Sequence, residues 1–145
     1  MKPIEFLDVA DRLKDSSEEA DRRSAVSRGY YAVYHSIRHY LKSKINDIPD
    51  DILRDHTAVI RCILEGGKVA NLPDVISFAR FLVELKNDRH EADYDLSSTK
   101  FNANQSVNFY DRCRKAIDEF DSYKNTQLIN GIEKYLILIN RIHRA

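Results

Sequence analysis

The amino-acid sequence predicts an all-α fold, an antiparallel bundle of five to six helices, on three observations. Only 4 glycines and 3 prolines occur in 145 residues, and they fall between segments in which apolar residues recur about every 3.6 positions. The content of 43% hydrophobic and 32% charged residues is typical of one compact domain with a single core. No internal repeat interrupts the chain. We therefore expect residues 1–145 to form a single helical domain.

The first half of the chain predicts three helices. A first helix is expected over 4–14, with Ile4, Leu7 and Leu13 on its core side. A long second helix is expected over 18–45, capped by Ser16 or Ser17. A shorter third helix is expected over 54–64, and the pair Gly66–Gly67 is expected to end it.

The second half predicts three more helical segments. Pro73 suits the first turn of the fourth helix, where its missing N–H costs nothing, and we expect this helix to end near Tyr94. The polar segment 95–104 is typical of an exposed loop, and a fifth helix is expected over 105–123. Residues 126–145 are expected to supply a C-terminal helix, apolar enough to pack on the bundle or on a partner subunit.

The charge balance limits the partners. Lys plus Arg and Asp plus Glu number 23 each, so only a local cluster of cations would hold nucleic acid. No apolar stretch is long enough to span a membrane, and the N-terminal segment has no secretory pattern. Cys62 and Cys113 are far apart and lack metal-ligand spacing, which indicates reduced thiols. We expect a cytoplasmic protein that does not interact with membranes.

One line of polar side chains on the long second helix is a candidate site. Arg28, His35 and His39 lie within about 20° of one line, opposite the apolar face of this helix. A solvated face is one interpretation, but such a face does not need histidine. His35 and His39 have the i, i+4 spacing of metal ligands, yet no intervening Glu and no third ligand accompany them. We therefore expect no metal here.

The end of the fourth helix carries a second group of polar side chains. If the helix persists, Arg89 and Asp93 continue its apolar stripe, where a charge needs a partner. Arg89 is then either paired internally, with Asp93 as the nearest candidate, or placed in a cleft to meet a ligand. His90 and Tyr94 add an imidazole and a phenol beside it, as nucleotide and RNA sites often have.

Two segments resemble a known family. RRSAVSRGYYAVYHSIRHYL (residues 22–41) and LKNDRHEADYDL (residues 85–96) are similar to the signature stretches of HEPN (higher eukaryote and prokaryote nucleotide-binding) domains, in the bacterial and archaeal branch. The resemblance implies a helical bundle that forms a homodimer, with polar residues of both copies in a shared cleft. It also implies a toxin–antitoxin or defence role, often beside a minimal nucleotidyltransferase partner, and in many members a metal-independent RNase activity without cofactor.

The resemblance also assigns candidate catalytic residues. The family motif is an Arg, a polar residue, three to five further residues and a His. Arg89 and His90 match its start, but Tyr94 occupies the position of the His. Cleavage of RNA would then need His90, or else His35, which stands at a comparable spacing from Arg28, to move the proton. Three functions stay open: an RNase, a non-catalytic module that binds a nucleotide or a nucleotidyltransferase, and a dimerising scaffold.

Overall fold

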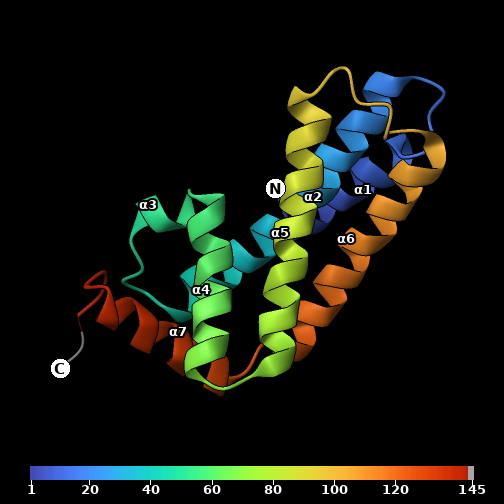
Figure 1. The fold of residues 1–145 in the computed structure, drawn as a ribbon. Helices are drawn as coiled ribbons and strands as arrows, with labels where there is room; N and C mark the ends of the chain where they lie inside the picture. Colours follow the sequence, from blue (N-terminus) through green and yellow to red (C-terminus); the bar gives the residue numbers. More distant parts are fainter. Residues whose placement is uncertain (144–145) are drawn as a thin grey trace. The chain divides into compact units, whose positions relative to one another are not determined.

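A computed structural model describes residues 1–143 of the chain and shows that the fold is all-helical (Figure 1). Within these residues there are seven helices and no strand. The helices are α1 (Pro3–Leu13), α2 (Glu19–Lys44), α3 (Asp50–Leu53), α4 (His56–Val69), α5 (Pro73–Tyr94), α6 (Ala103–Tyr123) and α7 (Thr126–Leu138). The predicted all-α helical fold is confirmed. In residues 1–143 no helix is both long and apolar enough to cross a bilayer.

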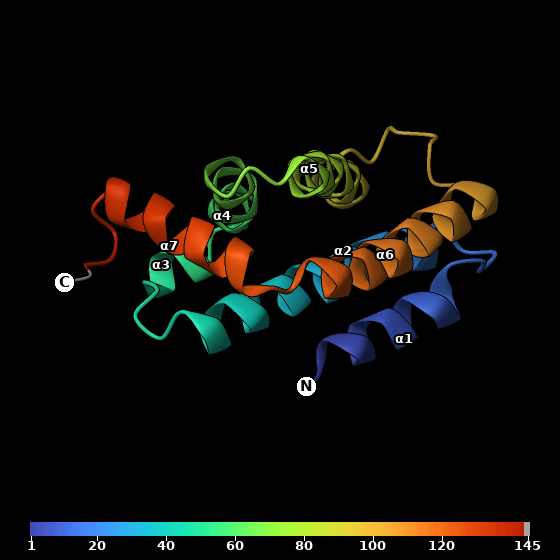
Figure 2. The ribbon, with the colours of Figure 1, turned by 90° about the horizontal axis from the view of Figure 1, so that it is seen from below.

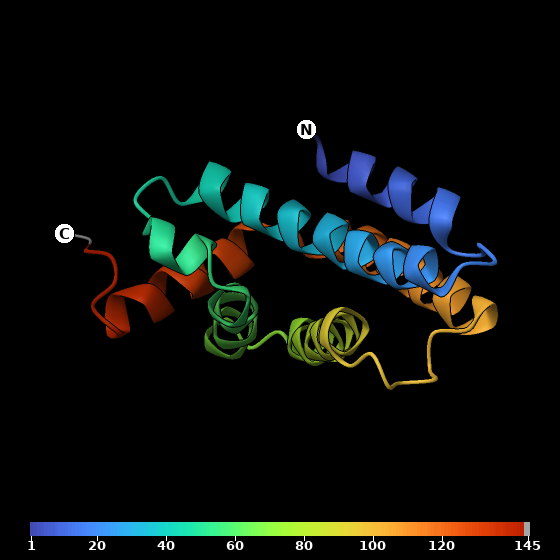
Figure 3. The ribbon, with the colours of Figure 1, turned by 90° about the horizontal axis from the view of Figure 1, so that it is seen from above.

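The chain divides into two compact units, and α2, α5 and α6 each contribute to both. The first unit consists of residues 1–36 and 84–118. In it α1 lies beside the first part of α2, as Figures 2 and 3 both show. The core of this unit takes buried side chains from α1, α2, α5 and α6: Leu7, Ala10, Val26, Tyr30, Leu85, Ala92, Phe109 and Cys113.

The second unit consists of residues 37–83 and the segment from Glu119 onward. Its helices α4 and α7 pack closely against each other (Figures 1 and 2). A Cβ atom on Gly131 would lie 2.3 Å from the backbone oxygen of Gly66, and one on Gly66 would lie 2.3 Å from Cγ1 of Ile132. The two backbones therefore come together where neither helix carries a side chain.

The prediction that Gly66–Gly67 ends a helix is wrong. Both glycines are buried inside α4, which begins after the short helix α3 and continues to Val69. The residue that ends this helix is Asn71, whose φ of 57° lies in the left-handed region that asparagine tolerates. The glycines at positions 66 and 67 do not reverse the chain. They allow α4 to pack closely against neighbouring residues, Ile132 at Gly66 and Val75 at Gly67.

Three other expectations need correction. The C-terminal helix predicted over 126–145 ends at Leu138. The chain reverses there because Asn140 takes a φ of 58° and the amide of Arg141 donates to the carbonyl of Leu136 at 2.8 Å. Residues 144 and 145 of the predicted helix lie outside the described part of the chain. Ile4, expected in the core, is 52% exposed. The segment 95–104 is largely exposed as predicted, but Phe101 within it is buried.

Candidate functional site

Arg89, on the part of α5 that belongs to the first unit, is held inside the protein. Its Nη1 lies 3.3 Å from Oδ2 of Asp93, one turn further along the helix. Its guanidinium carbon lies 5.3 Å and 5.8 Å from the ring centroids of Tyr30 and Tyr31 on α2, within the range of cation–π attraction. Only 11% of the side chain is exposed, and its buried Nε has no hydrogen-bond partner within residues 1–143. Arg89 is therefore paired internally.

The groups around Arg89 connect α5 to α2. The Ser27 hydroxyl lies 3.4 Å from the same Asp93 oxygen that accepts from Arg89. Burial raises the pKa of the Tyr30 phenol, an effect that the charge of Arg89 opposes. Tyr30 is therefore a neutral ring beneath the guanidinium at physiological pH. A partly buried ion pair of this kind is costly to break, because the remaining charge loses its partner.

His90 and Tyr94 lie on the exposed side of α5. Their ring centroids are 4.7 Å apart, and the ring planes are tilted by 46°. Tyr94 is 68% exposed, and His90 is also exposed. The structure thus brings these two predicted site residues together as a pair of rings at the surface. His90 directly follows Arg89 in the sequence, but its side chain leaves the helix in a different direction from the buried side chain of Arg89.

Arg28 and His35 meet at Phe6 of α1. The His35 ring stacks on the Phe6 ring, with centroids 5.1 Å apart and planes within 13°, and the guanidinium carbon of Arg28 lies 5.9 Å from the Phe6 centroid. The prediction that this line of α2 lies opposite the packed face is therefore wrong at His35, which is half-buried beside α1. The Tyr31 ring lies near Arg89 on one side and near the Phe6 and His35 rings on the other, so it connects these two sets of side chains.

The predicted site residues therefore form three groups, of which the exposed His90–Tyr94 pair is one. The second contains Arg89 and Asp93 beside the rings of Tyr30 and Tyr31. The third contains Arg28 and His35 on Phe6. The imidazoles of His90 and His35 each pack on an aromatic ring. Within residues 1–143, no three His, Cys, Asp or Glu side chains are grouped as a metal site requires.

Arg23 is an important residue that the sequence interpretation missed. It is only 8% exposed, and its Nη1 donates to the carbonyls of Ala92 (3.0 Å) and Asp95 (2.8 Å), while its Nη2 donates to the carbonyl of Ser98 (2.8 Å). Its guanidinium carbon lies 5.0 Å from the Phe101 centroid. A positive charge is favourable at this helix end, where the carbonyls point outward.

Arg22, the neighbour of Arg23, binds the same connection between α5 and α6. Its Nε donates to the carbonyl of Phe101 at 2.8 Å, and its Nη1 donates to the carbonyls of Ser16 and Ser17. The two arginines together fasten the segment that follows α5 to the beginning of α2. They therefore fix the end of the helix that carries His90 and Tyr94.

The two cysteines are buried and free, as the sequence predicts. Burial raises the pKa of Cys62 to about 12, and it raises that of Cys113 further. Gly29 leaves room for Cys113, because a Cβ at position 29 would lie 3.2 Å from the Cys113 sulfur. Both thiols are therefore protonated packing groups and not nucleophiles.

Two groups of predicted site residues are exposed on the described part of the first unit, the His90–Tyr94 ring pair and the Arg28 side chain beside Phe6. Neither group is built around a charged group that is both buried and unpaired, since Arg89 is bound to Asp93. Compared with protein-family models, with curated proteins and with solved structures, the chain gave no match.

Proposed function

We propose that this chain is a non-catalytic, HEPN-like module that binds a nucleotide at the exposed His90–Tyr94 pair. The observation that carries the proposal is the division of α5: Arg89 is bound to Asp93 and covered by tyrosine rings, while His90 and Tyr94 present their rings to solvent. We further propose that it acts as a homodimer in a toxin–antitoxin or defence system with a minimal nucleotidyltransferase partner. The similarity of residues 22–41 and 85–96 to HEPN signature segments supports this context.

The ring pair has the properties of a stacking platform. A nucleobase stacks on an exposed aromatic side chain with a gain of about 1–3 kcal/mol, whatever the base. Tyr94 offers such a ring, and His90 supports it from the preceding turn at 4.7 Å. Because a phenol stands where the family motif has a histidine, this position lacks the usual proton acceptor. The residues therefore favour binding over cleavage.

Arg89 acts as a positioning residue in this proposal. Its ion pair with Asp93 and its contacts with Tyr30 and Tyr31 hold the last turns of α5 on α2. Direct contact with a ligand phosphate would require Arg89 to leave Asp93, and a carboxylate without its partner is costly at a site with 26% exposure. Arg89 therefore orients the helix on which the ring pair stands.

A calorimetric titration of the full chain with AMP tests the proposal. Wild type should bind, and Tyr94→Ala should weaken binding by about tenfold or more, since one stacked base contributes about 1–3 kcal/mol. His90→Ala should weaken it less. Asn87→Ala is the matched control, because Asn87 is exposed on the same helix and should leave binding unchanged. Equal affinities of wild type and Tyr94→Ala, or no heat of binding, would contradict the proposal.

A metal-independent RNase is the second candidate, favoured by the arrangement of Arg28 and His35 on Phe6. In that case His35 would take the proton from the 2′-hydroxyl and Arg28 would stabilise the charge on the phosphate. An RNA oligonucleotide incubated with the protein in EDTA should stay intact if the module is non-catalytic. Cleavage that is lost in both His35→Ala and Arg28→Ala would establish the RNase and refute the non-catalytic role.

A further inference from the structure

A cavity of about 430 Å³ lies where the end of α2 meets the beginning of α7, and we call it the α2–α7 pocket. Its volume is within the range of about 300–1,000 Å³ that is usual for small-molecule sites. All the residues that line it belong to the second unit, so it is separate from the ring pair of the first unit. They are Tyr40, Lys44, Lys124, Asn125, Thr126 and Ile129. These six residues include two lysines and no carboxylate.

The two lysines differ in how their charges are matched. Nζ of Lys124 lies 2.7 Å from Oδ1 of Asp121, and it also lies 5.6 Å from the ring centroid of Tyr40. Lys44, in the last turn of α2, is exposed and forms no ion pair within residues 1–143. The end of α2 and the start of α7 contribute partial charges of opposite sign, which offset each other. Lys44 therefore leaves one positive charge at this pocket, which attracts an anion.

Tyr40 adds a donor without a partner to the wall of the α2–α7 pocket. This residue is only 7% exposed, and its hydroxyl forms no hydrogen bond to any other described residue. Burial raises the pKa of the phenol, so the hydroxyl keeps its proton at physiological pH. A largely buried hydroxyl has lost most of its contact with water, so it gains from an acceptor that enters the pocket.

The first turn of α7 supplies further donors. Asn125 caps this helix by accepting from the amide of Leu128 at 2.9 Å, and its carbonyl accepts from the amide of Ile129 at 3.3 Å. The amides of Thr126 and Gln127 precede these two and have no acceptor within the helix, as is usual for a first turn. The pocket is therefore lined by donors of several kinds, which together suit a group with several acceptor oxygens.

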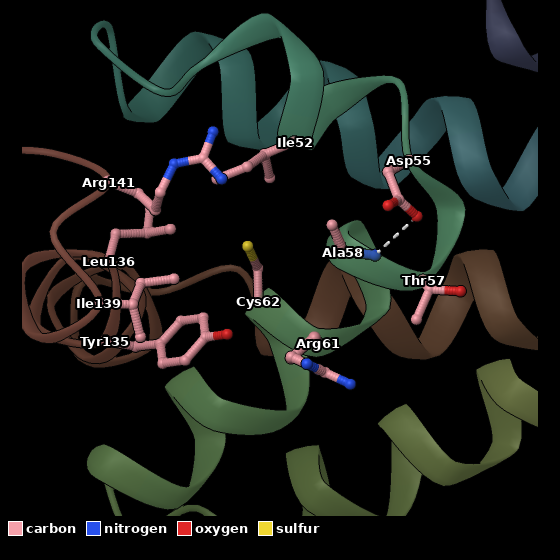
Figure 4. Close-up of a pocket in the computed structure, with 10 residues that line it drawn as sticks. All are labelled: Ile52, Asp55, Thr57, Ala58, Arg61, Cys62, Tyr135, Leu136, Ile139 and Arg141. Carbon is pink, nitrogen blue, oxygen red and sulfur yellow. Dashed lines mark hydrogen bonds between the residues drawn. The ribbon is translucent and has the colours of Figure 1, made fainter.

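The pocket between α4 and α7, of about 220 Å³, lacks this excess of donors (Figure 4). The carboxylate of Asp55 lines it, and Nη2 of Arg141 is bound to both carboxylate oxygens of Asp51. Figure 4 also shows that the head group of Arg61 points away from the Tyr135 hydroxyl. The charges around this second pocket are matched, so the α2–α7 pocket is the better site for an anion.

We propose that the α2–α7 pocket binds a phosphate monoester with a small apolar body. The phosphate accepts hydrogen bonds from Lys44, from the Tyr40 hydroxyl and from the start of α7, and the apolar body lies against Ile129. A phosphate monoester carries up to two negative charges and three acceptor oxygens, so it uses more of these donors than a carboxylate does. A charge-assisted hydrogen bond is stronger than a neutral one, so Lys44 favours the phosphate over an uncharged ligand. Nothing in this site depends on the proposed nucleotide binding at His90 and Tyr94.

Nuclear magnetic resonance titrations of the full chain with phenyl phosphate and with phenol, at one fixed ionic strength, test the proposal. Phenyl phosphate should produce saturable shifts of the amides of Lys44, Asn125 and Thr126. Phenol has the ring without the phosphate, so it should bind about tenfold more weakly or not at all. Lys44→Gln should weaken the binding of phenyl phosphate by about tenfold, and Tyr40→Phe, which keeps the buried ring, by a smaller factor.

Lys134→Gln is the matched control, because Lys134 is an exposed lysine on α7 outside the pocket. Tyr94→Ala is a second control, since AMP is itself a phosphate monoester and this variant separates the two proposed sites. Both variants should bind phenyl phosphate in the pocket as wild type does, and amide spectra of all free variants check that they are folded. A loss in either control would overturn the proposal. So would the absence of saturable shifts in the pocket, equal binding of phenol and phenyl phosphate, or a Lys44→Gln affinity equal to that of wild type.

Discussion

Arg23 shows how a single side chain organises the region around the candidate site. Its guanidinium is buried, and backbone carbonyls at the end of α5 and in the connection after it are its main acceptors. Glu19, at 3.4 Å, is its carboxylate partner and is largely exposed. A hydrogen bond from a charged donor contributes about 1.5–3 kcal/mol to the stability of the folded state. The contribution is large because a buried charge or carbonyl without a partner has given up its hydrogen bonds to water for nothing in return. Arg23 therefore stabilises the end of α5 more than an ordinary helix cap would.

We expect Arg23→Met to lower the free energy of unfolding by about 3–5 kcal/mol. Methionine fills similar space but leaves the carbonyls of Ala92, Asp95 and Ser98 without their donor. Urea unfolding followed by circular dichroism measures the change. Arg114→Met is the control, since Arg114 is exposed on α6. A loss for Arg23→Met no greater than that for the control would contradict the role given to this residue.

The sequence contained a signal for Arg23 that charge patterning alone does not reveal. Position 23 is seven residues before Tyr30, so the two side chains lie within about 20° of one line on the helix. Tyr30 faces the core, and an arginine on that line must find buried acceptors. Which carbonyls accept was not predictable, because they belong to residues about seventy positions away and depend on the tertiary fold.

At the same scale, the sequence predicted some site contacts but not others. The i, i+4 pairing of Arg89 with Asp93 follows from helical geometry and is present. The contact of His35 with Phe6 is not local, because it requires α1 to lie on α2. Periodicity does place Arg89 on the apolar stripe of α5, and the structure buries its side chain while His90 stays exposed.

Among the helices, α4 and α7 form the closest described backbone contact through glycine. Gly131 adopts ordinary helical φ, so alanine there would gain about 1 kcal/mol in helix propensity. Against this gain, the added Cβ would lie 2.3 Å from the backbone oxygen of Gly66. A backbone atom cannot move aside as a flexible side chain does, so the helices would have to separate. The packing loss outweighs the gain in propensity.

We therefore expect Gly131→Ala to destabilise the protein by about 2–3 kcal/mol, the typical cost of overpacking with backbone displacement. Asn130→Ala is the control, because Asn130 is exposed on the same helix and gains propensity without a clash. Thermal unfolding of the two variants beside wild type gives the comparison. If Gly131→Ala melts at or above the temperature of wild type, the contact is not as close as described.

Helix type was predictable along most of the chain, but helix ends were less so. The predicted segments 4–14, 18–45 and 105–123 lie within one or two residues of α1, α2 and α6, because caps and periodicity agree there. The ends of α4 and α7 were misplaced. In both cases an asparagine at positive φ, Asn71 or Asn140, reverses the chain after the helix. Gly66 looked like the stronger stop signal, but α7 requires it for packing.

Over the whole molecule, buried protonated groups should govern the alkaline limit of stability. Burial is the largest cause of a raised pKa at two thiols and four phenols. They are Cys62, Cys113, Tyr30, Tyr40, Tyr123 and Tyr135. The folded state keeps these protons at a pH where the unfolded chain releases them. Stability is therefore complete below the unfolded pKa values and falls as the pH rises above them.

The thiols should respond first, because their unperturbed pKa of 9.0 lies below the 10.0 of the phenols. We expect the free energy of unfolding to fall by up to about 1.4 kcal/mol per pH unit for each thiol once the pH exceeds that value. Urea unfolding at a series of alkaline pH values measures the slope. Cys62→Ala should make the decline shallower, whereas an unchanged slope in this variant would show that Cys62 does not contribute.

The attachment of residues 95–101 to Arg22 and Arg23 has a consequence for engineering. By composition this stretch resembles a place where a tag, a cleavage sequence or a few additional residues would be harmless. In the folded chain, however, the carbonyls of Asp95, Ser98 and Phe101 are acceptors for the two arginines. An insertion would shift these oxygens out of register with their donors. The length of this connection is thus as constrained as the sequence of a core helix.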